Sequence, residues 1–131
     1  MKKIILTLLI CLNFNITASN ADLMNPTIGE IAMFSGDFAP RGWAFCNGQV
    51  LPISSNPSLY SIIGKRYGGN GKTTFALPDL RGRAAIHVGG GHKLGDNGGK
   101  EQASLSTKAT KSFSYNTVQY IIAITGIHPS R

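Results

Sequence analysis

Short apolar stretches alternate with polar, glycine-rich stretches along this chain, a pattern that predicts strands and turns more than helices. The stretches 27–34, 73–77 and 83–88 combine apolar and β-forming residues and are flanked by Gly or Pro. The stretch 118–126 is apolar on both parities, which is typical of a central strand covered on both faces. We therefore predict a mainly β fold, a β-rich small α+β domain of short strands and hairpins.

One stretch has helical rather than strand spacing. Asn56 suits the N-cap, Pro57 the first helical position and Gly64 the C-cap of a short helix near 57–63. The apolar residues on one face of this helix are Leu59, Ile62 and Ile63.

A tight hairpin is predicted within 42–53, because two apolar arms meet at Asn47-Gly48, a dipeptide that accepts positive φ at both central turn positions. The stretch 89–99 is rich in glycine and predicts a loop. Residues 104–117 place apolar and aromatic side chains on one parity, which predicts a strand pair or an edge strand protected by lysines.

The N-terminus has the three parts of an export leader. Lys2 and Lys3 supply positive charge, residues 4–16 are largely apolar, and Ser19 and Ala21 place small residues at the positions that a leader peptidase recognises. We expect cleavage after Ala21, which predicts a signal peptide over 1–21 and a secreted protein in the periplasm or at the cell surface.

The mature chain, 22–131, is expected to form one domain. It has no second apolar span, so we expect no membrane span in the mature form. Cys11 leaves with the leader, and its position inside the apolar stretch after bulky Ile10 excludes a lipoprotein site. Cys46 remains without a partner in an apolar strand, where we expect a buried, inert thiol.

The net charge of +7 falls by two when Lys2 and Lys3 are removed, and it has two interpretations. The basic residues between 41 and 83 could form a basic face for anionic polysaccharide, lipid headgroups or nucleic acid. They could equally be scattered, solvated cations, because no run of basic residues exists. We expect no nucleic-acid partner.

The stretch GGNGKTTF, 68–75, resembles a phosphate-binding loop in composition, but its glycine spacing and its structural context differ from those of such a loop. The position that requires glycine, five before Gly71, holds Arg66. The stretch also follows a predicted helix and precedes a predicted strand, the reverse of the order that positions a phosphate at a helix N-terminus. We interpret it as a Gly-rich turn with a solvated lysine.

No catalytic constellation is expected. His87, His92 and His128 lie far apart without the spacing of a metal site, and the acidic residues show no pairing of the kind that acid/base catalysis uses. The serines near 54–58 lack a nucleophile-elbow context. We therefore predict a protein that is not an enzyme and that uses no cofactor or metal.

Residues 36–83 and 120–131 carry a series of unusual short motifs in a fixed order. They are Pro40-Arg41-Gly42-Trp43, Cys46-Asn47-Gly48-Gln49, Tyr67-Gly68-Gly69, Leu77-Pro78-Asp79-Leu80-Arg81-Gly82-Arg83, Ile86-His87, Gly126-Ile127 and Pro129-Ser130-Arg131. In these motifs the chain resembles the phage tail collar domain family, whose bacterial members are often labelled microcystin-dependent proteins. The resemblance covers about half of the mature chain.

The resemblance implies a β-rich domain near the shaft of short tail fibres, where three chains wrap together, and a structural and attachment role. Family members with a longer tail segment carry an HxH pair that holds a metal between three chains. This chain has no histidine between Gly99 and Tyr120, so the resemblance does not extend to that site. Asn47 stands where the family usually has Asp, and the leader indicates a bacterial protein that reuses the module outside the membrane.

The structural or interface candidates come from these motifs and from the terminal strand. They are Arg41, Trp43, Asn47, Gly48, Tyr67, Asp79, Arg81, Arg83, His87 and Tyr120. We expect Asp79 to cap a turn or to pair with Arg81 or Arg83, and His87 to be a hydrogen-bonded core or interface residue. Trp43 and Tyr67 could stack on sugars if exposed, but a core position is the better interpretation of Trp43.

These observations predict a structural module that self-associates, as a trimer or as a filament in which one chain's strand completes another's sheet. The alternative is a surface module that binds glycans or receptors through the 89–99 loop. A secreted hydrolase is a third class, and the sequence lacks the convergent catalytic groups that it requires.

Overall fold

The computed structural model describes residues 25–99 and 116–130. It contains five short strands, β1 (Ile31–Phe34), β2 (Trp43–Phe45), β3 (Val50–Pro52), β4 (Thr74–Ala76) and β5 (Gln119–Ala123). A single 3-10 turn (Ile53–Ser55) and one α-helix, α2 (Pro57–Ile63), complete the regular structure of these residues. The prediction of a mainly β domain with one short helix is confirmed.

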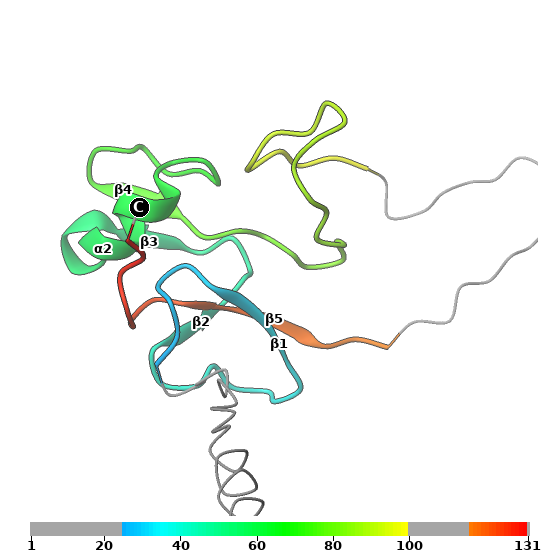
Figure 1. Ribbon diagram of the computed structural model, residues 1–131, viewed down its shortest axis with the longest axis horizontal. Helices are drawn as coiled ribbons and strands as arrows, with labels where there is room; N and C mark the ends of the chain where they lie inside the picture. Colours follow the sequence, from blue (N-terminus) through cyan, green and yellow to red (C-terminus); the bar gives the residue numbers. More distant parts are fainter. Residues whose placement is uncertain (1–24, 100–115, 131) are drawn as a thin grey trace, which may run out of the picture.

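The strands form two antiparallel sheets. One has the order β1-β5-β2 and the other pairs β3 with β4. In the first sheet Ala32 lies opposite Ile121, and Trp43 lies opposite Ala123. Figure 1 shows β5 between β1 and β2, with α2, β3 and β4 gathered above them on one side. The prediction of a central terminal strand is therefore confirmed, although β5 is shorter than 118–126.

Two apolar clusters lie on opposite faces of the three-stranded sheet, because successive residues of β5 point in opposite directions. Ile122 belongs to the larger cluster, whose other buried members are Ile28, Cys46, Leu59, Ile63, Phe75 and Leu77. Ile121 and Ala123 belong to the smaller cluster with Trp43, which is only 7% exposed. β5 is thus covered on both faces, and Trp43 is a core residue.

The helix forms where the sequence predicts it. Pro57 occupies its first turn, and Gly64 ends it at φ 59 with its N–H bonded to the Tyr60 carbonyl. Leu59 and Ile63 are its buried residues. Asn56 occupies the N-cap position, but its side chain makes no capping bond and donates instead to the Pro52 carbonyl at 3.1 Å.

The predicted hairpin within 42–53 is wrong. β2 pairs with β5 and β3 pairs with β4, so the two arms lie in different sheets. Gly48 has a φ of 74°, but Asn47 does not have the positive φ that the tight turn requires. In this arrangement Trp43 of β2 is buried in the smaller apolar cluster and Leu51 of β3 packs against the larger one, while Asn47 forms an isolated bridge with Asp79.

The predicted strand at 83–88 is not seen, because these residues have no ladder partner in the described part of the chain. The stretch 27–34 contains a strand only from Ile31, with Thr27 in an isolated bridge to Ile127. The strand at 73–77 is confirmed as β4, and 89–99 is a loop as predicted. The stretch 104–117 lies outside the described residues apart from its last two positions, which precede β5.

Candidate functional site

A largely apolar groove with a volume of about 960 Å³ lies on the described surface. One wall comes from β1 and β5, through Ile31, Met33 and Tyr120, and the other from the segments 78–88 and 92–99. Figure 1 shows this second wall as the green-to-yellow chain that runs away from the two sheets after β4. The groove thus forms between the sheet and a segment that belongs to neither sheet.

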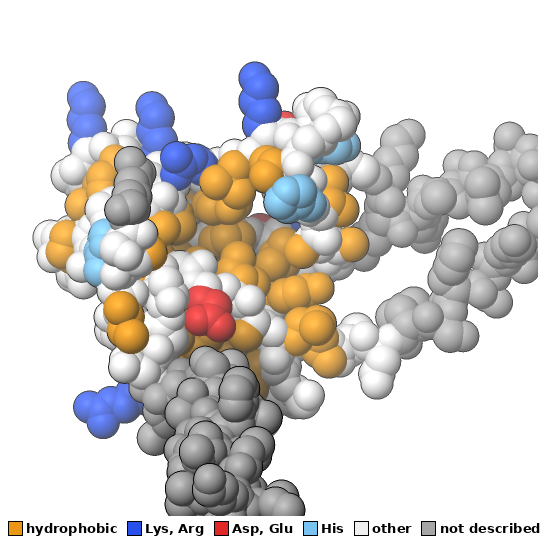
Figure 2. Space-filling model, viewed as in Figure 1, with side chains coloured by type: hydrophobic (Ala, Val, Ile, Leu, Met, Phe, Trp, Pro, Cys, Tyr) orange, Lys and Arg blue, Asp and Glu red, His pale blue; other side chains and the backbone are white. Residues whose placement is uncertain are grey.

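The groove is lined by large apolar side chains that water reaches. Met33 is 70% exposed, Ile86 69% and Leu94 58%. Figure 2 shows hydrophobic side chains gathered across this face, with basic and histidine side chains at its upper border. An exposed apolar surface of this kind is typical of a place where another molecule binds.

Asp79 and Arg81 form an ion pair at the groove. The Arg81 Nε and Nη2 atoms each donate a 2.8 Å hydrogen bond to the Asp79 carboxylate, and the Arg81 backbone N–H donates a third at 3.3 Å. These bonds lower the pKa of Asp79 to about 2. Both expected roles of Asp79, the turn cap and the pairing with Arg81, are present together.

Asn47 and Gly48 lie beside Asp79 and help to fix its position. The Gly48 N–H donates to the Pro78 carbonyl, and a Cβ added at Gly48 would lie 3.2 Å from the Asp79 Cβ. Glycine therefore allows the two segments to approach, and its φ of 74° disfavours other residues. The Asn47 Oδ1 atom is buried and has no hydrogen-bond partner among the described residues.

Most of the residues singled out in the sequence meet at this groove. Its lining includes six of the ten, namely Tyr67, Asp79, Arg81, Arg83, His87 and Tyr120. Trp43 lies in the smaller core cluster, and Arg41 is exposed in the turn before β2. Of the two roles expected for His87, the core position is not seen, because its side chain is exposed and makes no hydrogen bond within the described residues, and the interface role stays a prediction.

The apolar half of the groove is the part that the sequence reasoning missed. Met33 and Leu94 lie far apart in the chain, and neither belongs to a recognisable motif. The signal that could have found Met33 is its parity in β1, where Ile31 and Met33 alternate with the half-buried Ala32 and Phe34.

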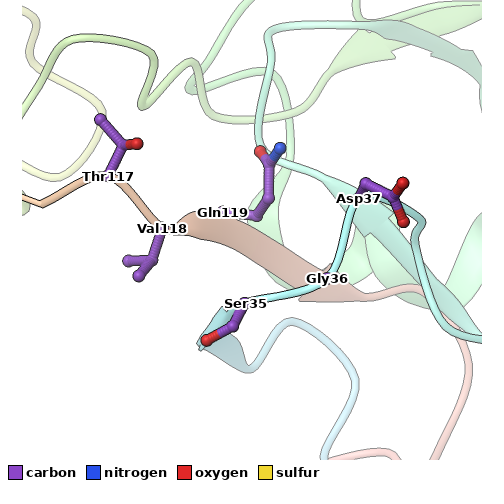
Figure 3. Close-up of a pocket in the computed structure, with 6 residues that line it drawn as sticks. All are labelled: Ser35, Gly36, Asp37, Thr117, Val118 and Gln119. Carbon is purple, nitrogen blue, oxygen red and sulfur yellow. The ribbon is translucent and has the colours of Figure 1, made fainter.

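A second hollow, of about 240 Å³, lies where β1 ends and β5 begins. Figure 3 shows its six lining residues, and the side chains of Ser35 and Asp37 point away from each other. Asp37 is the one carboxylate in this lining, so the hollow brings together no acid/base pair. We assign no chemistry to it.

The Gly-rich loop at 68–75 is organised around Asn70. The Asn70 Oδ1 atom accepts hydrogen bonds from the backbone N–H groups of Lys72, Thr73 and Thr74 at 2.8, 2.8 and 3.0 Å. A phosphate-binding loop offers such N–H groups to its ligand, whereas here a side chain of the loop already occupies them. The loop also connects α2 to β4, in the order helix then strand.

Cys46 has the buried thiol that the sequence predicts. It is 4% exposed, and burial raises its pKa to about 11. Since the thiolate is the reactive form, this environment makes the side chain a poor nucleophile at neutral pH.

The histidines occupy separate places. The Nε2 atom of His128 lies 3.1 Å from the Oγ atom of Ser61. His87 and His92 line the groove. Among residues 25–99 and 116–130, no group of three metal-ligating side chains comes together. The helix that the structure describes is too short to cross a membrane.

The part of the chain that contains β1, the Asp79 turn and α2 is similar to a known protein family. Residues 29–85 match the family model of the Phage Tail Collar Domain. This segment is similar to phage tail collar domains. The match includes β1 to β4, α2, the Asp79–Arg81 pair and Asn70, so the resemblance inferred from the motifs is confirmed.

The collar domain also has a relative among tail fibre proteins. The chain is 38% identical, over 80 residues, to the short tail fiber protein gp12 of Enterobacteria phage T4. The aligned part is 60% of this chain and 15% of that protein, so the chain spans a small fraction of its relative. β5 lies outside the collar match but supplies the middle strand of the main sheet.

Proposed function

We propose that this chain is an exported, non-enzymatic structural module that self-associates into an oligomer or an extracellular fibre. The observation that carries the proposal is the collar domain at 29–85, together with similarity to a short tail fiber protein. Two forms of assembly fit the proposal, a closed trimer and a filament in which chains exchange strands.

The distribution of apolar side chains supports self-association. The buried core of the described residues is small, and nine large hydrophobic side chains remain exposed. A domain of this size buries a limited share of its surface, and association with other chains removes further apolar surface from water. Five of the nine exposed side chains, Ile31, Met33, Ile86, Val88 and Leu94, line the groove.

The chemistry of the groove supports a role without catalysis. Asp79 and Asp96 are its acidic residues. The Asp79 carboxylate is engaged by Arg81, and the Asp96 Oδ2 atom accepts a 2.7 Å hydrogen bond from the Lys93 backbone N–H. Both carboxylates thus hold local structure in place, which is a poor arrangement for proton transfer.

Export is part of the proposal and rests on the leader. The basic start, the apolar stretch and the small residues Ser19 and Ala21 support cleavage after Ala21, with a mature domain over 22–131 in the periplasm or at the cell surface. Mass spectrometry of the native protein tests this. We expect a chain that begins at Asp22, and an intact Met1 on the purified native protein would contradict export.

The decisive experiment for self-association is size-exclusion chromatography with light scattering on the native protein. We expect a mass that is a multiple of the mature chain and that persists on moderate dilution. A strictly monomeric species at high concentration would overturn the proposed function.

The second candidate function is binding of a surface glycan or receptor. It is favoured by the exposed loop 89–99, which carries polar side chains beside the half-buried ring of Tyr67 in the same groove. A glycan array probed with the assembled protein and with a Tyr67→Ala variant tests it. Binding that is lost in the variant supports this function, and no binding by the assembled protein argues against it.

A further inference from the structure

We propose that residues 84–88 are an unpaired β-strand, and that a second copy of this chain pairs with it and fills the groove beside Met33. This inference rests on the proposed self-association and names the surface that carries it. The starting point is the disagreement between the sequence, which predicts a strand at 83–88, and the structure, which shows none there.

The backbone of this segment is free to form a ladder. The Arg83 N–H donates to the Leu80 carbonyl and the Gly89 N–H to the His92 carbonyl, but between them residues 84–88 make no backbone hydrogen bond to any described residue. A row of unpaired N–H and C=O groups beside apolar side chains is a template for pairing with another chain.

The side chains of the segment are mostly apolar, and its residues from Ala84 to Val88 all line the groove. The larger ones are in contact with water, since Ile86 and Val88 are 69% and 45% exposed. These side chains line the same groove as Met33 of β1. The described part of a single chain therefore leaves apolar surface exposed on both walls of the groove.

The surroundings of the groove leave room for a protein partner. A Cβ added at Gly89, Gly90 or Gly91 would meet nothing within 4 Å, so the turn that follows the segment leaves space for a neighbour. Further along the chain the backbone packs closely at Gly95, where an added Cβ would lie 2.7 Å from the Arg66 carbonyl oxygen.

The charges at the groove favour a second copy over a strongly anionic partner. Arg81 is already paired with Asp79, and the other charged lining residues are Arg83, Lys93 and Asp96, so both signs are present along the rim. A surface that is apolar at its centre and mixed in charge at its rim is complementary to another surface of the same composition.

Two substitutions and one matched control test the inference. Ile86→Glu and Met33→Glu place a carboxylate on either wall of the groove, and Val50→Glu places one on β3, where Val50 is 58% exposed and does not line the groove. All three positions are exposed, so the variants should fold and keep the wild-type circular dichroism spectrum.

We expect Ile86→Glu and Met33→Glu to weaken association by about 100-fold, because an unpaired charge would be buried at the interface. Val50→Glu should leave the mass measured by light scattering unchanged. A wild-type oligomer that persists in Ile86→Glu and Met33→Glu would overturn the proposed surface while leaving self-association intact. A wild-type monomer at every concentration would instead overturn both proposals.

Hydrogen–deuterium exchange of residues 84–88 gives a second readout that needs no variant. In the oligomer we expect these amides to exchange at least about 10-fold more slowly than in the dilute, dissociated chain, since pairing supplies their hydrogen bonds. Fast exchange in both states would contradict strand pairing. Slow exchange in both states would show a partner within the same chain and would also overturn the inference.

Discussion

Arg81 donates two parallel hydrogen bonds of 2.8 Å, from Nε and Nη2, to the carboxylate of Asp79, which lies two residues earlier in the sequence. This fork geometry is what an arginine offers and a lysine does not. The pair holds the turn between Pro78 and Gly82 at one end of the groove.

The first prediction concerns the titration of Asp79. Its pKa is lowered from 3.8 to about 2, chiefly by the side-chain hydrogen bonds from Arg81. Because the pKa of this carboxyl group is lower in the folded than in the unfolded protein, it stabilises the folded state above the unfolded pKa. This stabilisation is lost as the pH falls from about 4 to about 2. Carbon-detected NMR should give a midpoint near 2 for Asp79, and Arg81→Gln should return it toward 3.8.

Arg83→Gln is the matched control for this titration. Arg83 lowers the pKa of Asp79 through its charge alone, and this effect is the weakest of those that shift the pKa. The Asp79 midpoint should therefore change little in this variant. An equal change in the two variants would show that general positive charge, rather than the hydrogen-bonded fork, sets the pKa.

The second prediction concerns the loop organised by Asn70. Asn70→Ala removes the acceptor of three backbone N–H groups, and we expect a loss of about 1–2 kcal/mol in the free energy of unfolding. The amides of Lys72, Thr73 and Thr74 should exchange faster with solvent. Asn70→Asp keeps the acceptor oxygen and should preserve slow exchange. Identical exchange in wild type and Asn70→Ala would refute the role of this side chain.

The third prediction concerns the thiol of Cys46, measured in a Cys11→Ser background so that one thiol remains. Burial raises its pKa from 9.0 to about 11, so alkylation at pH 8 should be slow in the folded protein and rapid after unfolding. Because the raised value belongs to the folded state, stability is fully present below about pH 9 and falls as the pH rises toward 11. Rapid alkylation of the folded chain would contradict the buried position.

The fourth prediction compares two glycines. Gly69 has a φ of 85°, and a Cβ there would lie 2.7 Å from the Thr74 carbonyl oxygen, so Gly69→Ala should cost more than about 1 kcal/mol of stability. Gly98 lacks both constraints, and Gly98→Ala should stay within about 0.5 kcal/mol of wild type. Thermal unfolding of the two variants measures the difference. Equal melting temperatures would mean that the loop at Gly69 can rearrange without cost.

The elements that could be predicted from the sequence are those whose causes are local. Asn56, Pro57 and Gly64 mark the ends of α2, and the doubly apolar run that contains Ile121 and Ile122 indicates a central strand. The Asp79–Arg81 pair is equally local, because its partners are two residues apart. The order of the motifs extended this further and indicated the resemblance to the collar family over 36–83, which lies within the segment 29–85 that matches the family model.

The elements that could not be predicted depend on partners distant in the chain. The dipeptide Asn47-Gly48 is a strong hairpin signal, but the two arms that flank it pair with β5 and β4 instead of with each other. The groove arises only when β1 and the segment 78–99 come together, so no local pattern joins Met33 to Leu94. For residues 84–88 the pattern indicates a strand and the described chain supplies no partner.

The position of β5 has a consequence for biosynthesis. The middle strand of the main sheet follows both of its neighbours in the sequence, so β1 and β2 have open edges until residue 123 has left the ribosome. Ile121 and Ile122, which complete the two apolar clusters, arrive at the same late moment. A nascent chain therefore cannot close this sheet, and a translocation channel that accepts unfolded polypeptides would meet little resistance from it.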